Sequence, residues 1–380
     1  MKTTSTLIIA LAALSLASCA EDEPVSYNLE NENEISFRPA MGSRASEVTN
    51  ANLQSFWVTS FIGDTPYFNN VEFSKGAGGF FNSVKPYYWP ADTTSVEFYA
   101  YSPSLAALFP DDITGDDDDG WHDFYNSEDA GLTFNATEKK LVNFMVSDSI
   151  NKQVDFITAY GKGNRKENES AGVELTFDHR LTQIEIRAKS ENPTYTFKVK
   201  GVRIGRVQYM GSFDFTTNAW TLDEWHDTQV CESSFPEVTL TADPVSIMGP
   251  NGNAMLLPQT LVPWNNTGDP DNAARGAYLS VFVQISTTET GAVIYPFPSD
   301  TRLDPETKQL RKYAWASIPL STTWEAGKKY IYTLDFTNGA GYIDPDDPNP
   351  GKPVLGEAIK FTVTVNPWTD TPQPTPMPVK

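Results

Sequence analysis

The chain of 380 residues is long enough for two ordinary domains, and its 39% hydrophobic and 20% charged residues are sufficient for packed cores. Its net charge of −21 repels nucleic acid, so we expect no nucleic-acid partner. The only cysteines are Cys19 and Cys231. We expect the Cys19 sulfur to be acylated, for the reason given in the next paragraph, which leaves Cys231 without a partner. The sequence therefore predicts no internal disulfide and a semi-buried, apolar role for Cys231.

Residues 1–18 have the pattern of a secretory signal peptide. Lys2 gives a basic start, and the apolar run Leu7–Leu16 is too short for the roughly 20 residues that span a bilayer. Leu16-Ala17-Ser18-Cys19 resembles a bacterial lipobox, in which the cysteine is acylated and begins the mature chain. We therefore expect lipidation of Cys19 and an anchor in the outer membrane. The alternative is an ordinary signal peptide with a chance cysteine.

Residues 19–34 are polar and acidic, which is typical of a tether. Glu21, Asp22 and Glu23 directly follow the cysteine and resemble the surface-export signal of Bacteroides-type lipoproteins. This position predicts display on the outer surface of the cell.

Alternation of apolar and polar residues predicts half-buried β-strands along most of the mature chain. After a first strand at Ile35–Met41, the clearest examples are Val173–Phe177, Ile184–Ala188, Leu279–Ile285, Tyr330–Phe336 and Phe361–Val365. Helical periodicity is weak, so the pattern favours an all-β protein built from antiparallel sandwiches. We place two domains at 35–190 and 191–370. The tail 371–380 carries prolines at alternate positions and cannot form a central strand.

A long irregular region from Phe109 to about Ala130 contains the run Asp116–Asp119. Read as a calcium loop, it lacks two of the expected ligands, because Gly115 and Asn126 stand where oxygen-rich side chains are needed. We favour a solvated loop over an incidental divalent-ion site.

Signs of catalysis are missing from the sequence. The histidines His122, His179 and His226 do not form a metal-binding pair, and no nucleophile motif or nucleotide-binding loop is present. We therefore expect no enzyme activity, no cofactor and no metal. The nine tryptophans and sixteen tyrosines either fill cores or stack on sugars, and their spacing fits both interpretations.

Several motifs in a fixed order resemble the Bacteroidales fimbrillin-like family. They are Ile35-Ser36-Phe37, Ser43-Arg44-Ala45, Leu53–Val58, Tyr87-Tyr88-Trp89-Pro90, Val96–Pro103, Phe177–Ile184, Leu256–Gln259, Trp324–Tyr332 and Val365–Trp368. The resemblance spans nearly the whole mature chain. It implies two transthyretin-like β-sandwich domains and a lipoprotein subunit of type V pili, which support adhesion at the cell surface. It covers stalk, tip and anchor subunits alike.

In this family an arginine-specific protease removes an N-terminal strand, and a strand from another fimbrillin subunit fills the vacated groove. Arg44 fits that cleavage best, because it follows the first strand and lies among small residues. Arg38 lies inside the strand and precedes Pro39, so it is a poorer site; the alternative is that Arg44 is an ordinary surface arginine. For the donor strand we expect Ala358–Asn366, with Ile359, Phe361, Val363 and Val365 as its apolar face. The alternative is that this strand completes its own domain.

The competing interpretation is a surface glycan-binding lipoprotein of a polysaccharide-uptake system. It would explain the anchor and the aromatic residues, but not the arginine that follows the first strand. Further partners expected for a pilus subunit are glycans or proteins on host or bacterial surfaces.

Overall fold

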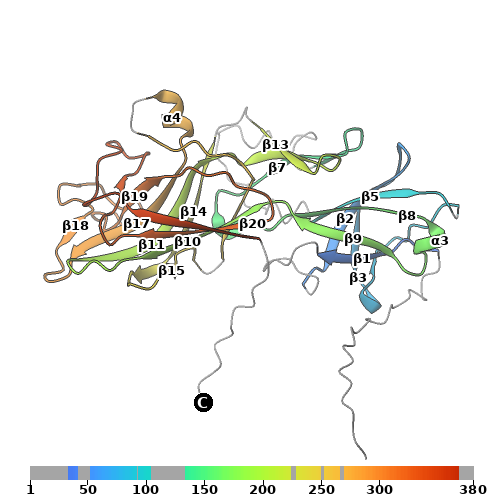
Figure 1. Ribbon diagram of the computed structural model, residues 1–380, viewed down its shortest axis with the longest axis horizontal. Helices are drawn as coiled ribbons and strands as arrows, with labels where there is room; N and C mark the ends of the chain where they lie inside the picture. Colours follow the sequence, from blue (N-terminus) through green and yellow to red (C-terminus); the bar gives the residue numbers. More distant parts are fainter. Residues whose placement is uncertain are drawn as a thin grey trace, which may run out of the picture.

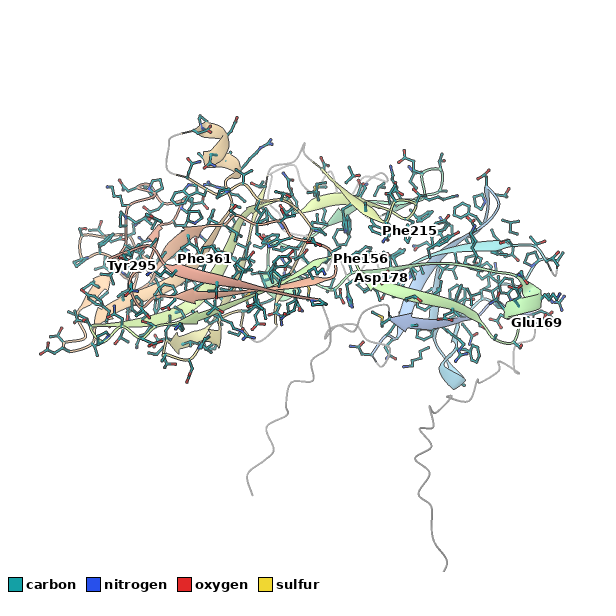
Figure 2. The ribbon with its side chains drawn as sticks, in the orientation of Figure 1. Phe156, Glu169, Asp178, Phe215, Tyr295 and Phe361 are labelled. Carbon is teal, nitrogen blue, oxygen red and sulfur yellow. The ribbon has the colours of Figure 1, made fainter. Side chains whose placement is uncertain are left out.

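The computed structural model describes residues 33–41, 52–91, 93–103, 133–223, 228–249, 252–265 and 269–367. Within these ranges most of the regular structure is β-strand, and the strands form two lobes that lie end to end (Figure 1). Side chains fill the interior of both lobes (Figure 2). The prediction of an all-β protein with two sandwich-like domains is confirmed.

The first lobe is a closed barrel with the strand order β1-β4-β3-β2-β5-β8-β9. Its strands are β1 (Phe37–Met41), β2 (Ser55–Ile62), β3 (Thr65–Lys75), β4 (Phe81–Asn82), β5 (Val96–Ser102), β8 (Ile157–Gly163) and β9 (Val173–His179), with the short helices η1 (Ala77–Gly79) and α3 (Arg165–Asn168). In β9, Val173, Leu175 and Phe177 are buried while Glu174 and Thr176 are exposed. The alternation of apolar and polar residues therefore predicted this strand correctly.

The second lobe contains two sheets around one core. One sheet has the order β15-β10-β20-β22, with β16 also on β10; the other has the order β14-β11-β17-β19-β21, with β18 also on β17. The strands are β10 (Thr182–Lys189), β11 (Tyr195–Val207), β14 (Gln229–Thr239), β15 (Val245–Ser246), β16 (Ala254–Leu256), β17 (Tyr278–Thr287), β18 (Val293–Tyr295), β19 (Ala314–Pro319), β20 (Lys328–Asp335), β21 (Tyr342–Ile343) and β22 (Lys360–Pro367), with helix α4 (Pro270–Arg275).

A small sheet lies where the lobes meet (Figure 1). It consists of β6 (Thr133–Asn135), β7 (Lys140–Met145), β12 (Met210–Asp214) and β13 (Ala219–Leu222), with η3 (Ile150–Lys152) after β7. The rings of Phe134 and Phe215 lie 5.7 and 5.4 Å from the ring of Tyr99 on β5. Aromatic contacts of this kind stabilise the packing of the small sheet against the barrel.

The chain passes from the barrel to the second lobe between β9 and β10, and polar contacts hold this crossing. The buried His179 imidazole contacts the Asp155 carboxylate at 2.8 Å through Nδ1. Arg180 donates from Nε to Thr158 Oγ1 at 2.6 Å, and its carbonyl accepts from Trp220 Nε1 at 2.7 Å. β10, which follows this crossing, pairs with β20 in a sheet of the second lobe.

Two strand pairs depart from the expected antiparallel arrangement. β1 runs parallel to β9, and β10 runs parallel to β20, while the other pairs between named strands are antiparallel. Among the residues that the structure describes, no helix is both long and apolar enough to cross a bilayer. Cys19, Arg44, the aspartate run 116–119 and the tail 371–380 lie outside the described residues.

Candidate strand-exchange site

The first strand closes the barrel, and the chain is buried most deeply at the first residue of the strand and just before it. β1 pairs with β9 on one side, from Phe37 opposite Val173 to Met41 opposite Phe177, and with β4 on the other side at Phe37. Ile35, Ser36 and Phe37 are fully buried. Removal of this strand would leave β4 and β9 as unpaired edges on either side of an apolar groove.

Phe37 is the deepest contact of β1. Its ring lies edge-on to three other phenylalanine rings, at centroid distances of 4.7 Å from Phe73, 5.0 Å from Phe98 and 5.7 Å from Phe56. Edge-to-face pairs of this kind are favourable beyond the burial of their area. The groove under β1 therefore has a pocket shaped for a phenylalanine ring.

The segment before β1 is held by the Tyr87-Tyr88-Trp89 motif. Ile35 N donates to Tyr87 O at 2.7 Å, and Trp89 N donates to Asn33 O at 2.9 Å. On the other side, Val173 N donates to Ser36 O at 2.9 Å. The groove is therefore longer than β1 itself and begins at Asn33.

Pro39 costs the β1–β9 ladder no hydrogen bond. In a parallel pair, a residue directs both its N–H and its C=O to the same neighbour, and the next residue turns to the other side. Because Ser36 bonds to β9, the even-numbered residues face β9 and Pro39 turns its missing donor away. This explains how a proline fits inside a paired strand.

The two candidate cleavage residues differ in position. Arg38 is half-buried within β1, opposite Glu174, and its guanidinium lies 5.8 Å from the centre of the Phe80 ring. A surface hollow of about 410 Å³ lies beside Arg38 and Ala40, against Gly172 and Glu174. Arg44 is outside the described residues, three positions after the end of β1 at Met41.

The predicted donor strand lies on the rim of the second lobe. β22 pairs with β20 along its whole length, from Lys360 opposite Asp335 to Pro367 opposite Lys328, and is the last strand of its sheet. Phe361, Val363 and Val365 remain 38%, 38% and 50% exposed, whereas Ile359, just before the strand, is 4% exposed. Figure 2 shows Phe361 on this last strand. β22 is thus a paired edge strand with a partly exposed apolar face.

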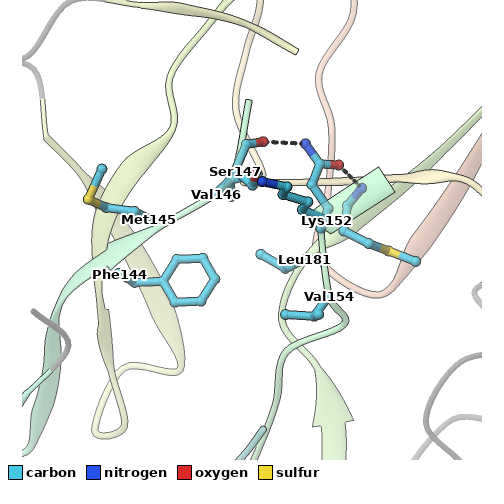
Figure 3. A pocket seen from close by; sticks show the side chains of 9 residues that line it. Phe144, Met145, Val146, Ser147, Lys152, Val154 and Leu181 are labelled. Atoms are coloured by element: carbon cyan, nitrogen blue, oxygen red, sulfur yellow. Dashed lines mark hydrogen bonds between the residues drawn. The ribbon is translucent and has the colours of Figure 1, made fainter. Parts of the chain in front are cut away.

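The other candidate sites in the described residues are a small hollow and a buried thiol. A hollow between η3 and β7 has a volume of about 10 Å³, enough for about one water molecule. Gln153 borders it and bonds to Ser147 O and Met255 N at 2.8 and 2.7 Å (Figure 3). Cys231 is a fully buried free thiol, and burial raises its pKa to about 12. In the described part of the chain, no group of three His, Cys, Asp or Glu side chains could hold a metal ion.

The aromatic residues mainly form the cores. Every tryptophan among the described residues is buried or half-buried: Trp57, Trp89, Trp220, Trp264, Trp315 and Trp324. Tyr88 and Tyr160 are exposed, at 54% and 44%. This distribution offers little support for a broad sugar-stacking surface in the described ranges.

The sequence matches the fimbrillin-like family over residues 43–368. The chain belongs to the fimbrillin-like family. The comparison with curated proteins finds no match. Among solved structures, the fimbrillin-like chain resembles a fimbrial protein from Bacteroides vulgatus at 14% identity and a TM-score of 0.51, covering 88% of this chain and 99% of that one. A proposed cell adhesion protein from Bacteroides uniformis shares 15% identity and a TM-score of 0.45, covering 88% and 98%.

Sequence reasoning about this fimbrillin-like chain found β1 and β22 but missed the residues that form the groove. Phe56, Phe73 and Phe98 come from three different strands, and their meeting at Phe37 is set by pairing that local patterns do not encode. The Tyr87-Tyr88-Trp89 motif can be recognised in the sequence, but nothing in the sequence indicates that this segment pairs with residues 33–35.

Proposed function

We propose that the protein is a subunit of surface fimbriae that is assembled by proteolytic loss of β1 and strand donation between subunits. The observation that carries this proposal is the position of β1: a short strand that closes the barrel, holds a central core ring and ends just before Arg44. Membership in the fimbrillin-like family and the fold shared with a fimbrial protein support it.

Cutting after Arg44 would release the strand without breaking the rest of the barrel. The fragment contains Ile35 and Phe37, and each fully buried side chain of this size stabilises the fold by roughly 1.5–3 kcal/mol. An opened groove would therefore expose apolar surface and two unpaired strand edges. Both are satisfied again by a strand added from another subunit.

The remaining parts of the proposal concern location and partners. Acylation of Cys19 would anchor the newly exported subunit to the outer membrane, and cleavage after Arg44 would release it into the fimbrium. Its partners are then other fimbrillin subunits, an arginine-specific protease and, for adhesion, glycans or proteins on neighbouring surfaces. Chemistry at an active site plays no part in this mechanism.

An arginine-specific protease tests the proposal directly. We expect mass spectrometry to find an acylated Cys19 at the start of the untreated chain and Ala45 at the start of the treated chain. The treated protein should form a ladder of multimers on a non-boiled gel. Arg44→Ala should abolish the new terminus and the ladder, while Arg38→Ala should keep both. A ladder that persists in Arg44→Ala would contradict cleavage at this residue.

A further inference from the structure

The outer face of the β14-β11-β17-β19-β21 sheet carries a cluster of aromatic rings. Val281 and Val283 of β17 are buried in the core, so Phe282 between them points to the opposite, outer face. Its ring lies 4.9 Å from that of Trp315 on β19 and 5.5 Å from that of Tyr313, just before β19. The core does not require rings on the solvent side of the sheet, so this cluster points to a binding surface.

Two cations lie on these rings. The Arg203 guanidinium lies 4.1 Å from the centre of the Trp315 ring, and the Lys200 ammonium group lies 5.4 Å from that of Tyr313. Arg203 Nε donates to Glu232 at 2.8 Å, which fixes the orientation of the guanidinium. Within the described ranges, the terminal nitrogens of Arg203 and Lys200 Nζ have no hydrogen-bond or ion-pair partner in the protein. Their N–H groups are therefore free to bind a ligand.

The backbone of β11 brings these groups to one face. Its pairing with both neighbouring strands shifts register at Lys200, which indicates a β-bulge, and bulges of this kind redirect a side chain. At the next residue, Gly201, a methyl group would lie 3.3 Å from Trp315 Cη2 and 3.4 Å from Phe282 Cβ. Glycine at this position therefore leaves room for the two rings to lie against the sheet.

We propose that this ring platform, formed by Lys200, Arg203, Phe282, Tyr313 and Trp315, binds the terminal acidic sugar of a glycan on a neighbouring cell surface. The sugar carboxylate accepts hydrogen bonds from the two cations, and a C–H face of the sugar lies against the exposed parts of the rings. A guanidinium with two free terminal nitrogens matches both oxygens of a carboxylate. The inference rests on the adhesive part of the proposed function, for which it names a site and a ligand class.

Charge favours a single acidic sugar over a long polyanion. The net charge of −21 repels polyanions at long range. Beside the platform, Glu232 pairs with Arg203 and Glu237 pairs with Lys198, both at 2.8 Å. Lys200 adds a positive charge without such a contact among the described residues. One carboxylate from a ligand completes this arrangement.

The position within the sheet favours a sugar over a peptide. β11 pairs with β14 and β17, and β17 pairs with β11 and β19, so the backbone under the platform is already hydrogen-bonded on both sides. A peptide that binds as an added strand needs a free edge. A sugar needs only ring faces for its C–H groups and a few polar groups at their border, and the platform offers both.

Oligosaccharides of different charge test the ligand class. The probes are sialyllactose, a disaccharide that ends in glucuronic acid, and lactose as the neutral match. In NMR titrations of the full, uncleaved chain, we expect at least one acidic probe to bind and lactose to bind about tenfold more weakly or less, because it lacks the charge-assisted contact. The C–H signals of the bound sugar should shift upfield, because they lie over ring faces.

Variants of the two cations test the site. Lys200→Ala and Arg203→Ala should each weaken binding by about tenfold or more, whereas Lys352→Ala, at an exposed lysine outside the platform, should leave it unchanged. Arg203→Lys should restore only part of the affinity, because an ammonium group lacks the planar fork of a guanidinium. Circular dichroism verifies the fold of each variant.

The outcomes separate this site from strand exchange. Equal binding of lactose and the acidic probes would contradict recognition of a carboxylate, and binding that survives both alanine variants would place the sugar elsewhere. Tighter binding of a tetra-aspartate peptide than of either acidic sugar would overturn the sugar in favour of an acidic protein segment. If no probe binds while the cleaved chain still forms multimers, the platform proposal is wrong and the proposed assembly stands. Binding without multimers would support the platform and contradict the proposed assembly.

Discussion

The Phe37 ring joins the packing of β1 to the core of the barrel, because it touches rings from β2, β3 and β5 at once. Its neighbours in the strand are less deeply placed: Pro39 and Met41 are half-buried. The contacts that stabilise β1 in the barrel are therefore concentrated at the N-terminal end of the strand. The proposed function requires that this strand leave the barrel as one piece after the chain behind it is cut.

Phe37→Ala should destabilise the barrel strongly. Replacement of a buried phenylalanine by alanine costs about 3–5 kcal/mol in free energy of unfolding, because it removes contacts and leaves a cavity. Urea unfolding followed by tryptophan fluorescence measures the change. Val84→Ala is the matched control, because Val84 is fully exposed and should change the free energy by less than about 0.5 kcal/mol. Equal stability of the two variants would show that the ring is not packed as described.

At the scale of elements, the period-two patterns predicted the strands well. Leu279–Ile285 lies within β17, Ile184–Ala188 within β10 and Phe361–Val365 within β22. Alternation is a local property, so it shows which residues share a face. It does not show the partner of each strand, and the parallel pairs β1–β9 and β10–β20 were therefore missed.

Alternation also left open how deeply a face is buried. Phe177 on β9 and Phe361 on β22 stand in similar patterns, but the first is fully buried and the second is 38% exposed. The difference arises because β9 lies inside a closed barrel while β22 lies at the end of its sheet. For the candidate site, the sequence located both strands, but the groove and its ring pocket required the fold, and Arg44 stays a prediction.

The parallel pair β10–β20 contains a charged link whose strength depends on pH. Glu185 on β10 accepts from Arg187 Nε at 2.6 Å, and Lys329 on β20 lies 2.8 Å away. Burial alone would raise the pKa of the Glu185 carboxyl, but hydrogen bonds and charge from Arg187 and Lys329 outweigh it and lower the pKa. The carboxylate therefore stabilises the fold above the ordinary pKa of 4.5, and this contribution is lost as the pH falls through the lowered value.

Glu185→Gln should remove this dependence. At pH 6 the variant should unfold more easily than the natural chain, because an amide cannot pair with Lys329 as a carboxylate does. As the pH falls below 4.5, the difference in free energy of unfolding should shrink. Urea titrations between pH 6 and pH 3 measure it, with Glu289→Gln in an exposed turn as the control. A difference that stays constant with pH would contradict an ionised Glu185 in the folded protein.

At the scale of the whole molecule, the groove and the proposed donor lie on different lobes. β1 closes the barrel, while β22 forms the rim of the second lobe (Figure 1). A contact between two different surfaces of the same chain is head-to-tail, and such contacts build open filaments unless the rotation closes a ring. The two-lobe arrangement thus suits the proposed assembly, in which each copy would accept a strand in one lobe and donate one from the other.

A chain that ends at Ile359 should therefore act as a terminator of the filament. It should fold, because the apolar residues of β22 are 38–50% exposed, Ile359 keeps its buried site, and β20 still pairs with β10. After the proposed cleavage at Arg44 it would have an open groove but would lack the predicted donor strand. Mixed with the full chain, it should shorten the multimers on a non-boiled gel in proportion to its fraction, while a chain that lacks only residues 371–380 should not. If the shortened chain fails to fold by circular dichroism, β22 completes its own domain, and if it folds without shortening the multimers, another segment is the donor.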